Sequence, residues 1–117
     1  MFENGLVNGI YDVGDGKKMI KHIVLLKFSE QTSNEQKEEV IIRLKSLKEE
    51  ISGIIDIFAG LNFSPNNSGF DIGLTVLFSD RHAFENYGPH PKHQEVVSYL
   101  KDVGMTDIII LDFPVLE

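Results

Sequence analysis

The sequence contains no cysteine and no tryptophan. Without a thiol, the chain cannot form a disulfide, use a thiolate nucleophile or build a zinc site from cysteine ligands. No apolar run approaches the ~20 residues that span a bilayer. Residues 1–18 also lack the basic start and continuous apolar stretch of a signal peptide. We therefore expect no membrane segment and a cytoplasmic location.

Positive charge is scarce as well. Eleven lysines and arginines stand against 18 aspartates and glutamates, which gives a net charge of −7. Nucleic acids and anionic membrane surfaces attract basic proteins, so neither is an expected partner. Solubility is the simplest explanation of the acidic balance. A glycine-rich phosphate loop, a nucleophile elbow and a dinucleotide fingerprint are all missing from the sequence, and we expect no cofactor.

The length of 117 residues suits a single domain. Residues 1–18 contain several glycines and show no sustained periodicity, so they are interpreted as an N-terminal extension. This extension would be a tag remnant, an alternative start or a short pairing arm, and residues 9–13 within it favour a short strand. Residues 19–117 carry the strong patterns and are predicted to form the domain.

Hydrophobic periodicity predicts the order βαββαβ within that domain. Alternation indicates strands, and apolar residues at helical spacing indicate helices. Ser33 is the expected N-cap of the first helix, and Gln36 completes a capping box. The predicted strands are residues 20–28, 54–62, 70–78 and 108–113, and the predicted helices are residues 33–51, 81–87 and 91–103.

This order is that of an α+β, ferredoxin-like fold, with a four-stranded antiparallel sheet and its helices on one face. Both faces of the predicted strands carry apolar residues, so the face without helices would expose a large apolar surface. A second copy is the natural cover, and two such sheets would form a dimeric α/β barrel. We expect a homodimer whose interface is the face carrying His22, Val24, Leu26 and Phe28, or lies close beside it.

A histidine-rich segment before the last helix is the candidate site. His90 lies near the N-cap and Pro91 suits the first helical position, which places His93 in the first turn. The helix macrodipole disfavours an imidazolium there, and a neutral imidazole is what a general base requires. Tyr87 can donate its phenolic hydrogen to a developing enolate oxygen. The expected catalytic residues are therefore His93 and Tyr87, and the resemblance given below adds His22.

Three segments together resemble a known family: IKHIVLLKF at residues 20–28, YGPHPKH at residues 87–93 and ILDF at residues 110–113. With the βαββ pattern between them, residues 19–117 are similar to the stress-responsive A/B barrel (Dabb) family, a branch of the dimeric α/β barrels. The resemblance implies a homodimeric barrel with a pocket in each subunit.

One plant branch of that family resembles a cofactor-free polyketide cyclase in which a tyrosine and a histidine form the acid–base pair. The matching positions here are Tyr87 and His93. His22 matches a pocket histidine on the first strand, and Ile72 stands where that branch has a further one. The resemblance implies a small aromatic or polyketide-like ligand and cyclase or isomerase chemistry. The expected pocket-lining residues are Val24, Leu26, Ile72, Leu74, Val76 and His90.

Other interpretations remain open. His22 is more often a hydrogen-bonded core histidine than a catalytic one, His90 is better explained as a helix cap, and Tyr87 is also explained as a core residue. Three histidines can bind zinc, although the sequence places no acidic partner beside them, and no metal site is adopted. The whole chain is alternatively a non-catalytic stress-related or interaction protein that acts as a stable dimer. A cavity above the ~300 Å³ lower bound of ligand sites, reached by His93 and Tyr87, would favour the small-molecule pocket.

Overall fold

Residues 6–7, 10–11 and 18–116 are described by a computed structural model of the chain. A small antiparallel pair, β1 and β2, precedes a four-stranded sheet with its helices. The short strand expected at residues 9–13 corresponds to β2, and residues 9, 12 and 13 lie outside the described residues. The division between residues 1–18 and 19–117 stays a prediction. The elements are β1 (Leu6–Val7), β2 (Ile10–Tyr11), β3 (Ile20–Phe28), α1 (Asn34–Glu50), β4 (Ile54–Leu61), β5 (Ile72–Phe78), α2 (Arg81–Tyr87), α3 (Pro91–Asp102) and β6 (Met105–Pro114).

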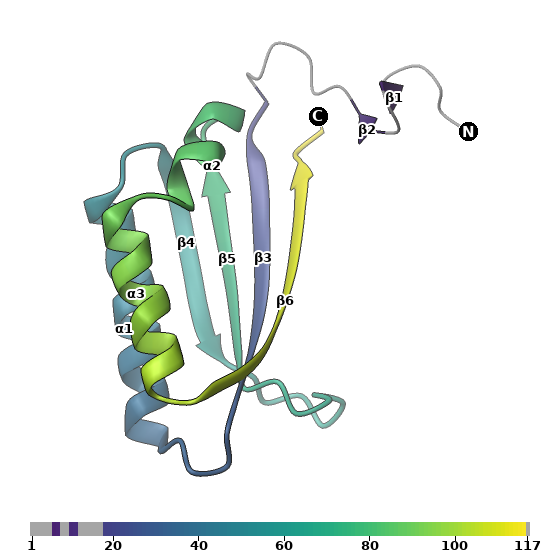
Figure 1. The fold of residues 1–117 in the computed structure, drawn as a ribbon. Helices are drawn as coiled ribbons and strands as arrows, with labels where there is room; N and C mark the ends of the chain where they lie inside the picture. Colours follow the sequence, from purple (N-terminus) through teal and green to yellow (C-terminus); the bar gives the residue numbers. More distant parts are fainter. Residues whose placement is uncertain (1–5, 8–9, 12–17, 117) are drawn as a thin grey trace.

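The sheet has the order β4-β5-β3-β6, and every neighbouring pair is antiparallel. Figure 1 shows α1 and α3 side by side along the sheet, with β6 at the edge away from them. This is the predicted α+β, ferredoxin-like fold. The last strand begins at Met105, earlier than expected, because Gly104 adopts a φ of +108° and turns the chain out of α3 directly into the sheet. In the described part of the chain, no helix is both long and apolar enough to cross a bilayer.

The first helix forms as the sequence indicates. The Ser33 hydroxyl accepts a hydrogen bond from the Gln36 backbone N–H, and the Gln36 side chain accepts one from the Ser33 N–H at 2.9 Å. Val40, Leu44 and Leu47 recur at helical spacing and are buried against the sheet. The predicted capping box and the predicted helix are therefore confirmed.

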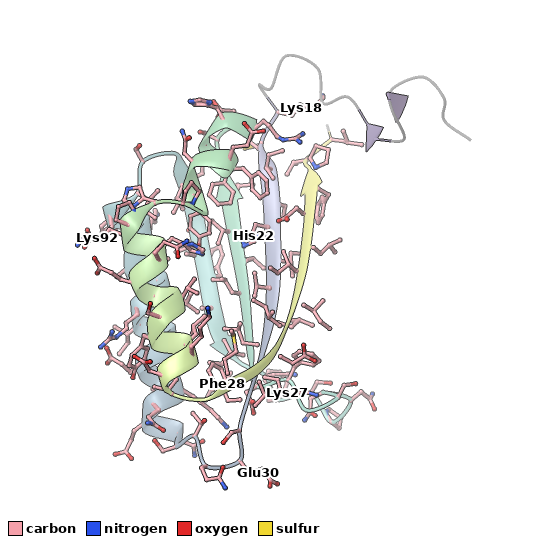
Figure 2. All side chains as sticks on the ribbon, viewed as in Figure 1. Lys18, His22, Lys27, Phe28, Glu30 and Lys92 are labelled. Atoms are coloured by element: carbon pink, nitrogen blue, oxygen red, sulfur yellow. The ribbon has the colours of Figure 1, made fainter. Side chains whose placement is uncertain are left out.

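The sheet face that was expected to form the dimer interface is the face covered by the helices. The side chains of His22, Val24, Leu26 and Phe28 are buried beneath the helices, and Figure 2 shows His22 pointing to that side. The expected dimer interface on this face is therefore wrong. Strand β3 is apolar on both faces, so the alternation of its residues alone does not tell which face the helices cover.

The face left open by the helices, here called the open face, is apolar. Leu25 of β3 pairs with Ile109 of β6, and Ile23 pairs with Leu111, so these side chains share it. Phe58 of β4 adds a ring that is 63% exposed. A shallow hollow of about 320 Å³ is bordered by Ile23, Leu25 and Phe58, where Gly60 pairs with Gly73.

Candidate functional site

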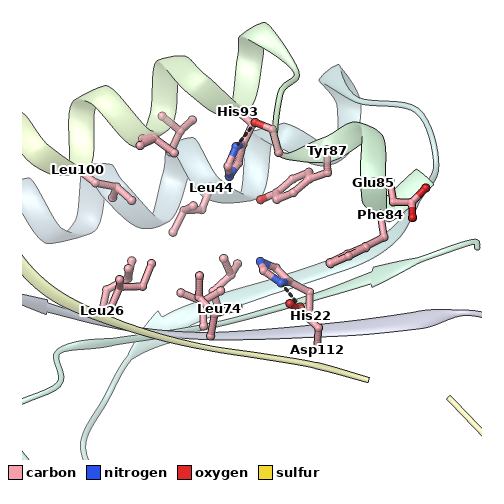
Figure 3. Close-up of a pocket in the computed structure, with 16 residues that line it drawn as sticks. His22, Leu26, Leu44, Leu74, Phe84, Glu85, Tyr87, His93, Leu100 and Asp112 are labelled. Carbon is pink, nitrogen blue, oxygen red and sulfur yellow. Dashed lines mark hydrogen bonds and ion pairs between the residues drawn. The ribbon is translucent and has the colours of Figure 1, made fainter. Parts of the chain in front are cut away.

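A cavity of about 430 Å³ lies between the helices and the inner face of the sheet. One end is aliphatic, and Leu26, Leu44, Leu74 and Leu100 line it. The other end is polar and is formed by His22, Tyr87, His93 and Asp112 (Figure 3). The volume exceeds the ~300 Å³ lower bound of small-molecule sites.

The structure brings together all three residues expected to be catalytic, but only half of the expected lining. Val24, Leu26 and Leu74 line the cavity. Ile72 and Val76 do not, because their side chains are fully buried in the core among helix residues. His90 does not line it either, since its ring is turned to the backbone. His90 is the N-cap of α3, and its Nδ1 accepts a hydrogen bond from the Lys92 N–H at 3.1 Å.

His93 is held with one ring nitrogen free. Its Nδ1 lies 2.9 Å from the carbonyl oxygen of Gly88, which can only accept a hydrogen bond. Nδ1 therefore carries the hydrogen, and in the neutral ring Nε2 keeps its lone pair. Figure 3 shows this second nitrogen directed toward the cavity. The Gly88 carbonyl is itself fixed by a second hydrogen bond, from the Gln94 side-chain amide at 2.7 Å.

The environment of His93 favours the neutral ring. Burial lowers the pKa of His93 below its ordinary value, and the nearby imidazoles of His22 and His90 act in the same direction, against the opposing hydrogen bond to Gly88. The sequence analysis gave the helix macrodipole as the reason for a neutral imidazole, whereas burial is the first cause here. A base with a free lone pair at neutral pH is the result.

Tyr87 ends α2 and is almost fully buried, with its hydroxyl directed into the cavity (Figure 3). Its ring centroid lies 4.2 Å from that of His93 and 5.7 Å from that of His22. Burial raises the pKa of the Tyr87 phenol far above its ordinary range. The hydroxyl therefore stays protonated and remains a hydrogen-bond donor.

His22 has an acidic partner that the sequence analysis missed. β3 and β6 place His22 opposite Asp112, and the His22 Nδ1 is hydrogen-bonded to the Asp112 carboxylate. This contact puts the Nδ1 hydrogen toward the carboxylate and directs Nε2 to the cavity. The available signal was a single acid within the apolar run of residues 108–113. The register of β3 against β6, which makes the pair, is a long-range property.

Phe84 is a second missed residue of the polar end. Its ring lines the cavity and lies 6.1 Å from the His22 ring, edge to face. The histidines do not converge as metal ligands. Within the described ranges, no group of three or more histidine, aspartate or glutamate side chains is placed to hold a metal ion. The arrangement is instead a proton acceptor, a proton donor and an oriented imidazole at one end of an apolar cavity.

Solved structures share this fold. A dimeric ferredoxin-like protein of unknown function from Bacteroides fragilis is 28% identical, with a TM-score of 0.70 over 86% of this chain and 99% of that chain. A hydroxynitrile lyase from Passiflora edulis is 19% identical, with a TM-score of 0.76 over 86% of this chain and 96% of that chain. A Dabb family protein from Mesorhizobium loti is 20% identical, with a TM-score of 0.70 over 86% and 99% of the two chains.

A comparison with curated proteins finds no match. The sequence itself matches the model of the stress responsive A/B barrel domain over residues 20–115, which is most of the chain. The match spans the strand that carries His22, the α2–α3 segment that carries Tyr87 and His93, and the strand that carries Asp112. This chain therefore belongs to the stress responsive A/B barrel domain family.

Proposed function

We propose that this protein binds a small carbonyl compound in the 430 Å³ cavity and catalyses proton abstraction next to the carbonyl, without a cofactor. One observation carries the proposal. A neutral imidazole with a free nitrogen and a protonated phenol face the same apolar cavity, with the ring centroids of His93 and Tyr87 4.2 Å apart. An acid–base pair of this kind is sufficient for enolate chemistry.

In the proposed reaction, the Nε2 atom of His93 takes a proton from the carbon next to the carbonyl. The electron pair of the broken C–H bond moves into the enolate, and the Tyr87 hydroxyl donates a hydrogen bond to its oxygen. For cyclisation, the enolate carbon attacks a second carbonyl within the substrate, and the new alkoxide takes the proton back from His93; the resulting alcohol can then leave as water. For isomerisation, His93 returns the proton to another carbon of the conjugated enolate. His22, held by Asp112, orients the substrate or the base.

An enzyme is favoured over the alternative of a non-catalytic stress-related protein. A barrel whose only role is assembly has no need of an open interior, whereas the cavity here reaches Tyr87 and His93. The Passiflora edulis protein, described as a hydroxynitrile lyase, is an enzyme built on the same fold. The mostly apolar lining suits an aromatic or polyketide-like ligand.

A screen of aromatic and polyketide-like carbonyl compounds tests this proposal. We expect at least one compound to raise the melting temperature of the protein and to be converted to a product of equal mass, or of lower mass by one water, in mass spectrometry. A compound at 100 times its dissociation constant stabilises the folded state by about 2.7 kcal/mol, which a thermal shift resolves readily. If no compound in a broad screen binds, the non-catalytic alternative is favoured instead.

We further propose that the protein is a homodimer joined through the open face. Leu25 and Leu111 are 36% and 55% exposed there, and Phe58 of the opposite edge strand shares the same face. A contiguous apolar surface of this kind is typical of an interface. The similar structure from Bacteroides fragilis is described as dimeric. A two-fold interface requires self-complementarity, and protruding side chains beside the Gly60–Gly73 hollow supply both halves of such a match.

Replacing Leu111 with aspartate should dissociate the dimer, because each interface would then bury an unpaired carboxylate. Light scattering at micromolar concentration should give about twice the 13.2 kDa chain mass for the wild type and the single mass for the variant. Ile42→Asp is the matched control, since Ile42 is 61% exposed on α1, away from the sheet, and should leave the dimer intact. A monomeric wild type would disprove the proposed assembly.

A further inference from the structure

The charges of the side chains that line the cavity indicate which ligand charge the site can accept. Among the described residues that line it, the formally charged side chains are Glu85 and Asp112, and none is a lysine or an arginine. Asp112 is hydrogen-bonded to His22. Most of the remaining lining is aliphatic or aromatic. The cavity therefore presents two carboxylates, two imidazoles and a phenol to its occupant, with no fixed positive charge.

Three cations of the helices each lie near a carboxylate. Arg81, one helical turn from Glu85 on α2, has its Nε 3.4 Å from the Glu85 carboxylate. The Lys92 Nζ lies 3.9 Å from the Glu50 carboxylate, and Figure 2 shows Lys92 on the side of α3 away from β3. Arg43 pairs with Glu39 at 2.9 Å. Lys92 and Arg43 thus have carboxylate partners outside the lining, and Arg81 lies against Glu85.

We infer that this site takes an uncharged carbonyl compound and excludes carboxylate- or phosphate-bearing analogues of the same shape. The inference rests on the proposed function and names the substrate class of that site. An anion that enters an apolar cavity loses its hydration, and here it would find no counter-ion to replace it. The net charge of −7 opposes the approach of anions as well. The pKa of His93, lowered by burial, agrees with this, since a neutral ring offers no compensating charge.

A matched pair of ketones tests the inference by binding alone. 4-Acetylbenzamide and 4-acetylbenzoate have nearly the same shape and share the ketone, but only the second is anionic at pH 7.5. We expect calorimetry to show that the amide binds about 100-fold more tightly, the order of effect of a buried and unpaired charged group. The difference between the two affinities should shrink as the pH falls. Protonation of His93 then supplies a positive charge that can pair with the benzoate, and protonation of the benzoate removes its negative charge.

Glu85→Lys is the informative variant. Glu85 is an exposed residue at the cavity, and its reversal adds a cation there and releases Arg81. The variant should shift the ratio of the two affinities about 10-fold toward 4-acetylbenzoate at low salt, and 0.5 M salt should weaken this shift. Glu49→Lys is the control, because it makes the same change in net charge on the exposed side of α1 and should leave both affinities unchanged.

Equal affinity for the two ketones would overturn the inference and leave proton abstraction by His93 untouched. An equal shift of this ratio in Glu85→Lys and Glu49→Lys would also overturn it, because the net charge and not the cavity would then select the ligand. Failure of both ketones to bind would overturn the assignment of the cavity to neutral carbonyl compounds. Failure of the proposed function has a separate readout, namely turnover that survives the loss of the His93 base.

Discussion

His93→Gln is expected to lower turnover of the carbonyl substrate by about 10²–10⁴-fold, the usual contribution of a positioned general base. Glutamine can still donate a hydrogen bond toward the Gly88 carbonyl, which His93 contacts at 2.9 Å, but it has no basic nitrogen. Tyr87→Phe removes only the hydroxyl that stabilises the enolate oxygen, and it should cost about 10²–10³-fold in kcat, as for an oxyanion-hole donor. Steady-state kinetics on the compound found in the screen would measure both losses.

His82→Gln is the control for these two variants. His82 is exposed on α2 and is not among the residues lining the cavity, so its replacement should leave kcat and KM unchanged. Melting temperatures of all three variants would separate a catalytic loss from a folding defect. Turnover within a few-fold of wild type in both His93→Gln and Tyr87→Phe would remove these two residues from the mechanism.

The proposed role of His93 as a base predicts how turnover depends on pH. His93 is active as the neutral ring, and burial lowers its pKa below the ordinary value of 6.5, so kcat should be constant around pH 7 and should decrease only below pH 6.5. The free energy of unfolding should also decrease as the pH falls below 6.5. Below pH 6.5 the unfolded chain binds a proton at His93 that the folded protein resists, so stability is complete above this pH and is lost as the pH falls toward the lowered value. NMR titration of the imidazole would locate the pKa directly, and His93→Gln should show a smaller loss of stability in acid.

Phe78→Ala should have the largest effect on folding, with a loss of about 3–5 kcal/mol from a total that is typically about 5–15 kcal/mol. The Phe78 side chain is completely buried at the end of β5. Its ring centroid lies 5.0 Å from that of Tyr87 and 6.1 Å from that of His22. The variant should therefore also loosen the tyrosine and histidine that it supports. Urea denaturation would measure the loss of stability.

Phe78→Leu provides the comparison, because it keeps most of the apolar volume and loses the aromatic edge contacts. It should destabilise the protein less than Phe78→Ala and still lower turnover, since the Tyr87 ring loses its packing partner. If Phe78→Ala unfolds at the same urea concentration as wild type, the aromatic cluster is not a main support of this end of the sheet.

The order of elements was readable because each leaves a local signal. Ser33 and Gln36 mark a helix start three residues apart, and Asp80 and Gly88 bound the short helix α2 within one segment of chain. The face of β3 that the helices cover was not readable, since both faces are apolar. It is decided by which strand neighbours which and by where α1 and α3 pack, and these are contacts between distant parts of the sequence.

The site residues also divide into those that follow from the local sequence and those that depend on contacts between distant segments. Tyr87 and His93 flank one Gly-Pro break, so their proximity follows from local geometry. Asp112 lies 90 residues from His22, and only the pairing of β3 with β6 makes it a partner. Ile72 and Val76 share the inward face with Leu74, yet only Leu74 reaches the cavity. Which inward side chains reach the cavity depends on how the helices pack over the sheet, and period-two alternation does not encode this.

The edge position of β6 has a consequence for how the two proposed roles of the protein interact. Successive residues of this strand point to opposite sides of the sheet, so Asp112 faces the cavity and Leu111 faces the open face. A partner that packs on Leu111 would therefore also fix the strand that orients His22. Ligand affinity and subunit affinity would then be thermodynamically coupled, and a ligand that prefers the ordered strand would strengthen association by the same factor by which association strengthens its binding. Dilution of the protein would then weaken ligand binding by dissociating the proposed dimer, and the ligand would oppose this dissociation.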